Sequence, residues 1–323
     1  MLPKIGILAG GGLLPELIIR NCQETGREFY VIAFTGQAKR DAFKNVPHSW
    51  VRLGAAGRTI KILRKFGIKE LVLAGTVRRP TLTKLMPDFW AARFIIKTKT
   101  FNQGDNSLLS SLIRVLEEKE GFSIIGVDKI LPGLIAKIGI YGNIQPKDTD
   151  EINIKVGVFG AQELGKLDIG QSVIARSGKV LLSEDVHGTN SLLIRAKEFR
   201  SQSPDGILVK VKKPGQERRV DLPTIGPKTI EEAALAGLKG VVIEAENTII
   251  LDLKSVIEKA NKYNLFVKSI NIPKPYPLIF LIAGEPSGDL LGASLMKAIR
   301  KEIKNKVVFS GVGGTHMEKQ GLD

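Results

Sequence analysis

The sequence predicts an α/β protein with a Rossmann-like N-terminal domain, a second α/β domain and an incomplete β-α-β tail. Short apolar segments alternate with amphipathic helical segments, as in parallel sheets that are covered by helices. A glycine-rich turn follows the first apolar segment, and the same order returns behind a proline-rich stretch near the C-terminus. The chain of 323 residues, 43% of them hydrophobic, is long enough for separate cores.

Residues 1–135 are expected to form the Rossmann-like domain. Residues 3–34 contain a short apolar strand, the glycine-rich turn, a helix and a second apolar strand, which together make a β-α-β unit. Residues 69–80 supply another strand, residues 106–121 an amphipathic helix and residues 122–132 a further strand. Parallel packing of these strands is the economical arrangement.

Residues 136–270 are expected to form the second α/β domain. Its predicted strands and helices are strands at 206–215, 239–245 and 247–253 and helices around 152–163, 229–236 and 253–262. The segment 271–277, NIPKPYP, reads as a stiff linker because proline cannot continue a helix or a central strand. Residues 278–323 then begin a new strand, glycine loop, helix and strand. A parallel sheet needs more strands than this, so the tail is predicted to be a truncated domain.

Composition limits the possible functions. The net charge of +15 indicates an anionic partner, which could be a phosphorylated metabolite, a nucleic acid or an acidic membrane surface. With 6% aromatic residues and no recognisable nucleic-acid-binding motif, we expect no nucleic-acid partner. The single Cys22 excludes an intramolecular disulfide, and three scattered histidines leave carboxylates as the metal ligands. No signal peptide or apolar run of about 20 residues appears, so a cytoplasmic location is expected.

The first candidate site is the loop Gly10-Gly11-Gly12, which opens a helix. Unpaired amides and the helix dipole at such a position favour a phosphate group. A dinucleotide-dependent oxidoreductase is the competing interpretation, but Pro15 stands where its third glycine belongs and the second strand ends in residues 34–36 without a carboxylate. A third possibility is that the glycines only permit a tight turn.

A second loop follows the strand at 69–74. Its Gly75, Thr76, Arg78 and Arg79 lie where open α/β sheets place ligands, and the arginines could clamp a diphosphate. They could equally be solvated surface charges. Asp105, just ahead of a predicted helix, is either an ordinary helix cap or a metal ligand.

The strongest local signal is residues 210–230, KVKKPGQERRVDLPTIGPKTI. Residues 208–220 carry five basic residues against one acidic residue, and Asp221 follows at the start of a proline-bounded loop. Nearby cations favour the ionised carboxylate, so Asp221 is suited to hold Mg²⁺ or to orient a water molecule. Arg218 and Arg219 could neutralise phosphate oxygens. The alternative is an ion pair between Asp221 and one of these arginines that only fixes the loop.

Further residues join this candidate site. Gln216 and Thr224 of the same stretch are included as substrate-binding residues. The pair Glu184 and Asp185, together with Glu244, could add oxygen ligands to a metal ion, or each could equally be a surface carboxylate.

Four segments of the chain carry a family resemblance, namely IGILAGGGLLPELI, WVRLGAAGRTIKILRKFGIKELVLAGTVRRP, LDIGQSVI and KKPGQERRVDLPTIGP. In this order and spacing, residues 3–270 resemble the LpxI family of UDP-2,3-diacylglucosamine pyrophosphatases of lipid A biosynthesis. The resemblance implies a homodimeric, Mg²⁺-dependent enzyme that releases UMP and 2,3-diacylglucosamine 1-phosphate. Its substrate would lie between a nucleotide-substrate domain and a catalytic C-terminal domain, and the aspartate matching Asp221 would be required. The family usually has Glu-Gly-Thr-Asp where this chain has residues 187–190, HGTN.

The tail has its own resemblance. Residues 280–299, FLIAGEPSGDLLGASLMKAI, and the later GVGGTHME are similar to the start of lipid-A-disaccharide synthase. Only a small part of that enzyme is present, so we expect no transferase activity. A diacylated substrate would also need an apolar wall, and residues 89–96, FWAARFII, could form one, could contact the inner membrane peripherally, or could be ordinary core.

Overall fold

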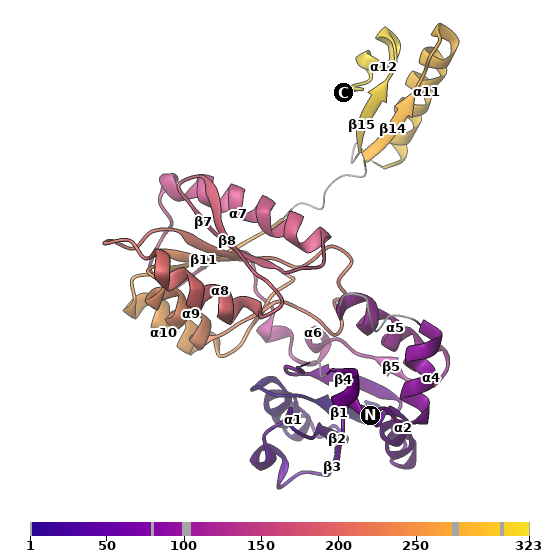
Figure 1. Ribbon diagram of the computed structural model, residues 1–323, viewed down its shortest axis with the longest axis vertical. Helices are drawn as coiled ribbons and strands as arrows, with labels where there is room; N and C mark the ends of the chain where they lie inside the picture. Colours follow the sequence, from indigo (N-terminus) through magenta and orange to yellow (C-terminus); the bar gives the residue numbers. More distant parts are fainter. Residues whose placement is uncertain (1, 79–80, 99–104, 273–277, 304–306, 323) are drawn as a thin grey trace. The chain divides into compact units, whose positions relative to one another are not determined.

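The computed structural model describes residues 2–78, 81–98, 105–272, 278–303 and 307–322 (Figure 1). The chain divides into two compact units, residues 1–271 and 272–323. Both are α/β in character, which confirms the predicted fold class. Among the described helices, none is long and apolar enough to cross a membrane.

The first half of the larger unit is built on a parallel five-stranded sheet with strand order β3-β2-β1-β4-β5. Its elements are β1 (Ile5–Ala9), α1 (Leu14–Glu24), β2 (Phe29–Phe34), β3 (His48–Val51), α2 (Ala56–Lys65), β4 (Glu70–Ala74), α3 (Leu82–Leu85), α4 (Phe89–Thr98), α5 (Asp105–Glu118), β5 (Ser123–Ile124) and α6 (Val127–Ile130). Side chains alternate along β1: Ile7 packs in one buried cluster and Leu8 in the other. Because both faces are buried, these strands read as continuous apolar runs in the sequence.

The second half is built on a mixed six-stranded sheet with strand order β6-β13-β11-β9-β7-β8. Its elements are β6 (Gly139–Tyr141), α7 (Asp148–Lys166), β7 (Ser172–Arg176), β8 (Lys179–Ser183), α8 (Gly188–Ala196), β9 (Ile207–Lys210), β10 (Thr224–Ile225), α9 (Pro227–Leu235), β11 (Gly240–Glu244), β12 (Ile249–Ile250), α10 (Leu253–Lys262) and β13 (Phe266–Ile270). Helix α7 covers one face of the sheet, and α8, α9 and α10 cover the other (Figure 1).

Three predicted strands are shorter than the sequence indicated, and the one at 206–215 gives only β9. Residues 122–132 give only β5, because the chain turns into α6 after Gly126. Residues 247–253 give only β12, which pairs with β10 in a separate two-stranded sheet. The β7–β8 hairpin was not predicted.

Loops from the second half pack into the cores of the first half. Val220 packs against the cluster that contains Leu8, whereas Leu222 and Leu251 pack against the cluster that contains Ile7. Ile249 is itself a buried member of that second cluster. The segment around Asp221 therefore completes both hydrophobic cores of the first half.

The smaller unit is a β-α-β arrangement with one extra helix, as predicted for the tail. Its elements are β14 (Leu278–Ile282), α11 (Pro286–Glu302), β15 (Val308–Val312) and α12 (Thr315–Lys319), and the two strands are parallel. Met296, Phe309 and Met317 form its small core. Phe280 and Ile282 are 62% and 74% exposed, so one face of the sheet has no covering layer within this unit. The predicted linker lies mostly outside the described residues.

Candidate active site

The two N-terminal candidate loops meet at the carboxyl edge of the first sheet. Strands β1 and β4 are neighbours, and their loops exchange hydrogen bonds from Gly11 N to Thr76 O and from Thr76 N to Gly11 O, both 2.8 Å long. The Gly10 amide donates to Ala74 O at 2.8 Å. Strand order changes direction at β1, which is where open α/β sheets bind ligands.

This junction requires glycine. A Cβ atom at Gly10 would lie 2.5 Å from Thr76 O, and one at Gly75 would lie 2.3 Å from Gly11 O. Gly75 also has a φ of 88°, which side-chain-bearing residues rarely adopt. The amides of Gly10 and Gly11 are thus already bonded. Within the described chain, Gly12 is the member of the triplet whose amide has no backbone acceptor.

The arginine loop is held by a side-chain clasp. Gln37 donates from Nε2 to Arg78 O at 3.0 Å and accepts from Arg78 N at 2.8 Å. The Arg78 residue is exposed, and no described residue pairs with its guanidinium. Sequence reasoning did not find Gln37, which lies 41 positions away from its partner. Arg79 and the side chain of Asp105 lie outside the described residues, although Asp105 does begin α5.

Asp221 is held by Gln216. The buried Gln216 amide donates to Asp221 Oδ2, and its own Oε1 accepts from Lys213 N at 3.0 Å. The Asp221 amide donates to Glu217 O at 3.0 Å. No described residue donates to Asp221 Oδ1, so the half-buried carboxylate keeps one oxygen for a ligand.

Arg218 and Arg219 do not pair with Asp221 in the described structure. Arg218 bonds Asp128 at 2.5 Å and donates to Glu246 O at 2.8 Å. Arg219 binds Glu117 at 2.6 Å and Glu217 at 3.0 Å. The alternative of an Asp221 ion pair is therefore wrong.

These ion pairs fasten the loop to the first half of the unit. Hydrogen bonds, chiefly to Glu217 and then to Glu117, raise the pKa of Arg219. The predicted role of Arg218 and Arg219 as phosphate neutralisers would require these contacts to break.

Glu184 and Glu244 lie at the same edge of the second sheet but on strands three positions apart in the order β8-β7-β9-β11. Strand spacing of about 4.8 Å separates their backbones by about 14 Å. Glu184 accepts from Gln171 N at 2.9 Å, and Glu244 accepts from Lys212 N at 2.7 Å. Each carboxylate is thus turned to its own local donors. No group of three metal-ligating side chains occurs among the described residues.

Lys210 is a site residue that the sequence analysis missed. It ends the central strand β9, is 7% exposed, and donates to Thr189 Oγ1 at 3.0 Å and to Thr224 O at 3.1 Å. Burial lowers the pKa of Lys210, while the negative charges of Glu184 and Asp221 oppose that change. The available signal was a lysine that closes the otherwise apolar strand segment ILVK.

Two further predicted positions are placed by the structure. The Thr224 hydroxyl donates to Leu222 O at 3.1 Å within its own loop, so its contact with the rest of the site is through its carbonyl. Asn190 is exposed. Its neighbour Thr189 instead donates to Glu184 Oε1 at 3.0 Å and accepts from Lys210.

The Asp221 loop approaches the same sheet edge as the glycine loops. A Cβ atom at Gly126, just after β5, would lie 3.4 Å from the Cα atom of Arg219. Strands β1, β4 and β5 are successive neighbours, and β5 ends three residues short of the end of β1 in register, so the two strand ends are about 14 Å apart. One edge of the first sheet therefore presents the Gly12 amide and Arg78 near the loop that carries Asp221.

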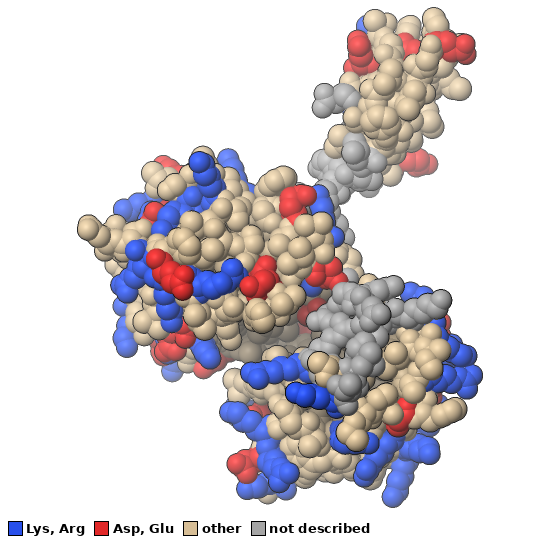
Figure 2. All heavy atoms as spheres, viewed as in Figure 1, with Lys and Arg blue, Asp and Glu red and all other residues tan. Residues whose placement is uncertain are grey.

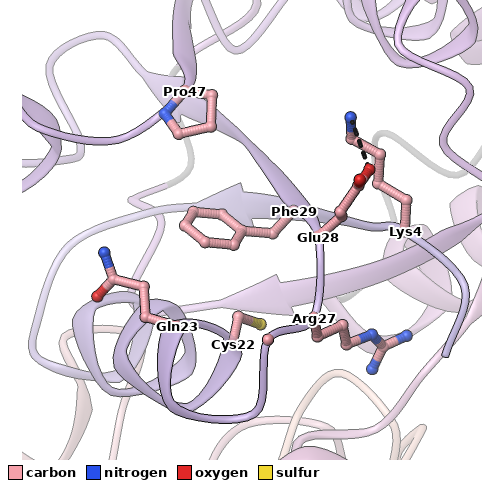
Figure 3. Close-up of a pocket in the computed structure, with 8 residues that line it drawn as sticks. Lys4, Cys22, Gln23, Arg27, Glu28, Phe29 and Pro47 are labelled. Carbon is pink, nitrogen blue, oxygen red and sulfur yellow. Dashed lines mark ion pairs between the residues drawn. The ribbon is translucent and has the colours of Figure 1, made fainter. Parts of the chain in front are cut away.

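A pocket elsewhere in the first half does not belong to this site. It is lined by Lys4, Cys22, Arg27 and Phe29, among others, at the amino ends of β1 and β2 (Figure 3). Burial raises the pKa of the Cys22 thiol. Lys and Arg are spread over the visible face of residues 1–271 and do not gather in one patch (Figure 2).

Comparisons with known proteins agree with the two halves and the tail. Residues 4–134 match the family model of the LpxI N-terminal domain, 137–268 that of the LpxI C-terminal domain, and 279–323 that of lipid-A-disaccharide synthetase. The chain is 36% identical over 277 residues to the UDP-2,3-diacylglucosamine pyrophosphatase LpxI of Caulobacter vibrioides, covering 83% of this chain and 98% of that protein.

The tail is 62% identical over 45 residues to the lipid-A-disaccharide synthase of Rhodospirillum centenum, covering 14% of this chain but only 11% of that enzyme. The likeness to a solved structure, CobK precorrin-6A reductase, has a TM-score of 0.28 at 10% identity over 84% of this chain and 89% of that one, which is too weak to inform the fold or activity. From both domain matches and the coverage of its pyrophosphatase relative, the chain belongs to the LpxI family.

Proposed function

We propose that this chain hydrolyses UDP-2,3-diacylglucosamine to UMP and 2,3-diacylglucosamine 1-phosphate in lipid A biosynthesis, acting in the cytoplasm. The observation that carries the proposal is the Asp221 carboxylate, held by Gln216 with one oxygen free, on a loop beside the ligand-binding edge of the first sheet. The similarity to a pyrophosphatase of that specificity along almost its whole length supports the choice of substrate.

The diphosphate would bind at the edge where β1 and β4 end. The amide of Gly12 and the start of α1 attract negative charge, and the exposed Arg78 can form paired hydrogen bonds to phosphate oxygens. Water would attack the phosphorus next to the sugar, and the bond from that phosphorus to the bridging oxygen would break. UMP would leave with the bridging oxygen.

Mg²⁺ fits this site through Asp221 alone among the described carboxylates. Magnesium is usually held by one or two carboxylates together with substrate phosphates and water, so the missing cluster of three is no obstacle. Oδ1 of Asp221 is the available ligand atom, and the ion would neutralise developing charge on the phosphates. Gln216 keeps the other oxygen of Asp221 in place, which orients the carboxylate.

The substrate's acyl chains require an apolar surface, and α4 offers one. Trp90 packs on the core, whereas Phe89 and Ile96 are 83% and 73% exposed. We propose that these two side chains contact acyl chains or the inner membrane peripherally. Flotation with anionic liposomes should capture the protein and lose it on substituting both residues with serine; absence of capture in the parent protein contradicts the membrane contact.

We further propose a homodimer and no transferase activity for the tail. Light scattering of the purified protein tests the first statement, and a monomeric mass contradicts it. Formation of the disaccharide from the two lipid substrates would disprove the second.

The decisive experiment is UMP release from UDP-2,3-diacylglucosamine with Mg²⁺ and then with EDTA. We expect turnover that EDTA abolishes, and at least a hundredfold loss of kcat in Asp221→Asn with substrate binding retained. Asp205→Asn is the matched control, since the half-buried Asp205 lies ahead of β9, at the opposite edge of the second sheet, pairs there with Arg176 at 3.8 Å and should leave turnover unchanged. No UMP in the parent protein would favour another nucleotide-dependent enzyme or a binding protein, while unchanged turnover in Asp221→Asn would remove Asp221 from the mechanism.

A further inference from the structure

Lys210 is a buried cation with no carboxylate partner among the described ion pairs. It lies at the end of β9, opposite Ser172 of β7 and next to Ile243 of β11. Its ammonium is satisfied by two neutral oxygens, the Thr189 hydroxyl and the Thr224 carbonyl. Glu184 and Asp221 offset part of the cost of burying this charge without forming an ion pair with it, so a purely structural role would be served better by an apolar side chain.

The two acceptors of Lys210 belong to different elements. Thr189 lies in the first turn of α8, and its hydroxyl also donates to the buried Glu184 and lies 3.2 Å from Ser172 Oγ. Thr224 opens β10, three positions after Asp221. Lys210 therefore joins the central strand and α8 to the far end of the loop that carries Asp221.

The same loop is held at its near end by Gln216, which bonds Asp221 directly. Between Asp221 and Thr224 stand Leu222, packed in the core of the first half, and Pro223, whose φ is fixed by its ring. Few backbone torsions are left free in this stretch. A shift of the Thr224 carbonyl would therefore be passed on to Asp221.

We infer that Lys210 is a positioning residue, which fixes Asp221 in its reactive place by binding Thr224 and Thr189 with its buried ammonium. The inference rests on the proposed function for its kinetic consequence. The structural consequence, a rigid loop at residues 221–225, does not depend on the proposed function.

The kinetic test compares Lys210→Met with Lys268→Met. Lys268 lies on β13 of the same sheet and pairs with Glu151 at 2.6 Å, so it controls for loss of a lysine. We expect kcat for UMP release to fall tenfold to a hundredfold in Lys210→Met, with KM within threefold and a Tm at or above that of the parent protein. An unchanged kcat in a folded Lys210→Met protein would overturn the inference, as would an equal loss in Lys268→Met.

If Lys210→Met does not fold, the pair Thr189→Ser and Thr189→Val replaces it. The serine variant keeps the hydroxyl and should retain kcat, whereas the valine variant keeps the shape and should lose about tenfold. Equal rates in both variants would overturn the inference.

Amide hydrogen exchange separates this inference from the proposed function. In Lys210→Met, or in Thr189→Val, exchange in residues 221–225 should quicken while β11 and β13 keep their protection. If the parent protein releases no UMP, the proposed function fails and this measurement alone decides: unchanged exchange in residues 221–225 overturns the role of Lys210.

Discussion

The glycine and arginine loops of the first half, residues 10–12 and 75–79, and the basic loop of the second half, residues 210–221, both combine glycine with nearby basic residues. Their polar groups nevertheless have different partners. Around Gly12 and Arg78, the structure leaves an amide and a guanidinium available. In the basic loop, Arg218 and Arg219 are bound to carboxylates from the first half. A local excess of positive charge in a sequence can therefore come from ion pairs that fasten a loop as well as from a site that binds an anion.

The largest expected effect concerns the close approach between the two N-terminal loops. Gly75→Ala should lower the free energy of unfolding by about 3 kcal/mol, because its Cβ would meet Gly11 O and its φ is unfavourable for alanine. Gly12→Ala has the same unfavourable sign of φ but open space around its Cβ, so about 1 kcal/mol is expected. Denaturant unfolding of both variants tests the difference, and equal losses would contradict it.

The second effect tests whether Arg78 is available to the substrate. Arg78→Ala should raise KM for UDP-2,3-diacylglucosamine about tenfold and leave Tm unchanged, because the guanidinium has no partner in the described structure. Arg78→Lys keeps the charge without the paired geometry and should give a smaller increase. A KM equal to that of the parent protein in Arg78→Ala would exclude substrate contact.

Substitution of Arg219 should change stability more than KM, which is the opposite of the effect expected for Arg78. Arg219→Ala is expected to lower the free energy of unfolding by about 1 kcal/mol, since it removes a partly exposed ion-pair network with Glu117 and Glu217. Its KM should change less than that of Arg78→Ala. A tenfold higher KM with unchanged stability would show that the arginine leaves its carboxylates for the substrate.

The smallest expected effect is a pH dependence at Glu217. The hydrogen bond from the Arg219 side chain lowers the pKa of Glu217 from its ordinary value of 4.5. Its stabilising contribution is therefore present above pH 4.5 and is lost as the pH falls through the lower folded-state pKa. Glu217→Gln should flatten this part of the stability curve by under about 1 kcal/mol in urea unfolding at stepped pH; a curve as steep as that of the parent protein would contradict this.

The fold was largely predictable because its signals are local. Apolar runs gave β1, β2, β9 and β11, and the periodic segment at 253–262 is α10. The missed β7–β8 hairpin also had a local signal, since Ser177 and Gly178 form its turn with φ values of 50° and 71°. The early end of β5 was harder to foresee, because residues 122–132 remain apolar after the strand has ended.

The candidate site was less predictable because its contacts join distant positions. Asp221 and Gln216 are close in sequence and were both selected. The partners of Arg218 and Arg219 in the first half lie 90 and 102 positions away, so the sequence showed two cations without showing that they were bound to that half. Lys210 likewise looks like one basic residue among five until the fold encloses it.

The placement of Val220 and Leu222 in the two cores of the first half has a calorimetric consequence. The first half cannot keep its cores intact when the second half melts, because Val220 and Leu222 come from the second half and complete the packing of those cores. Residues 1–271 should then melt in a single cooperative heat-absorption peak, although they contain two sheets. Heating would therefore unfold the loop that carries Asp221 and both sheets in the same transition.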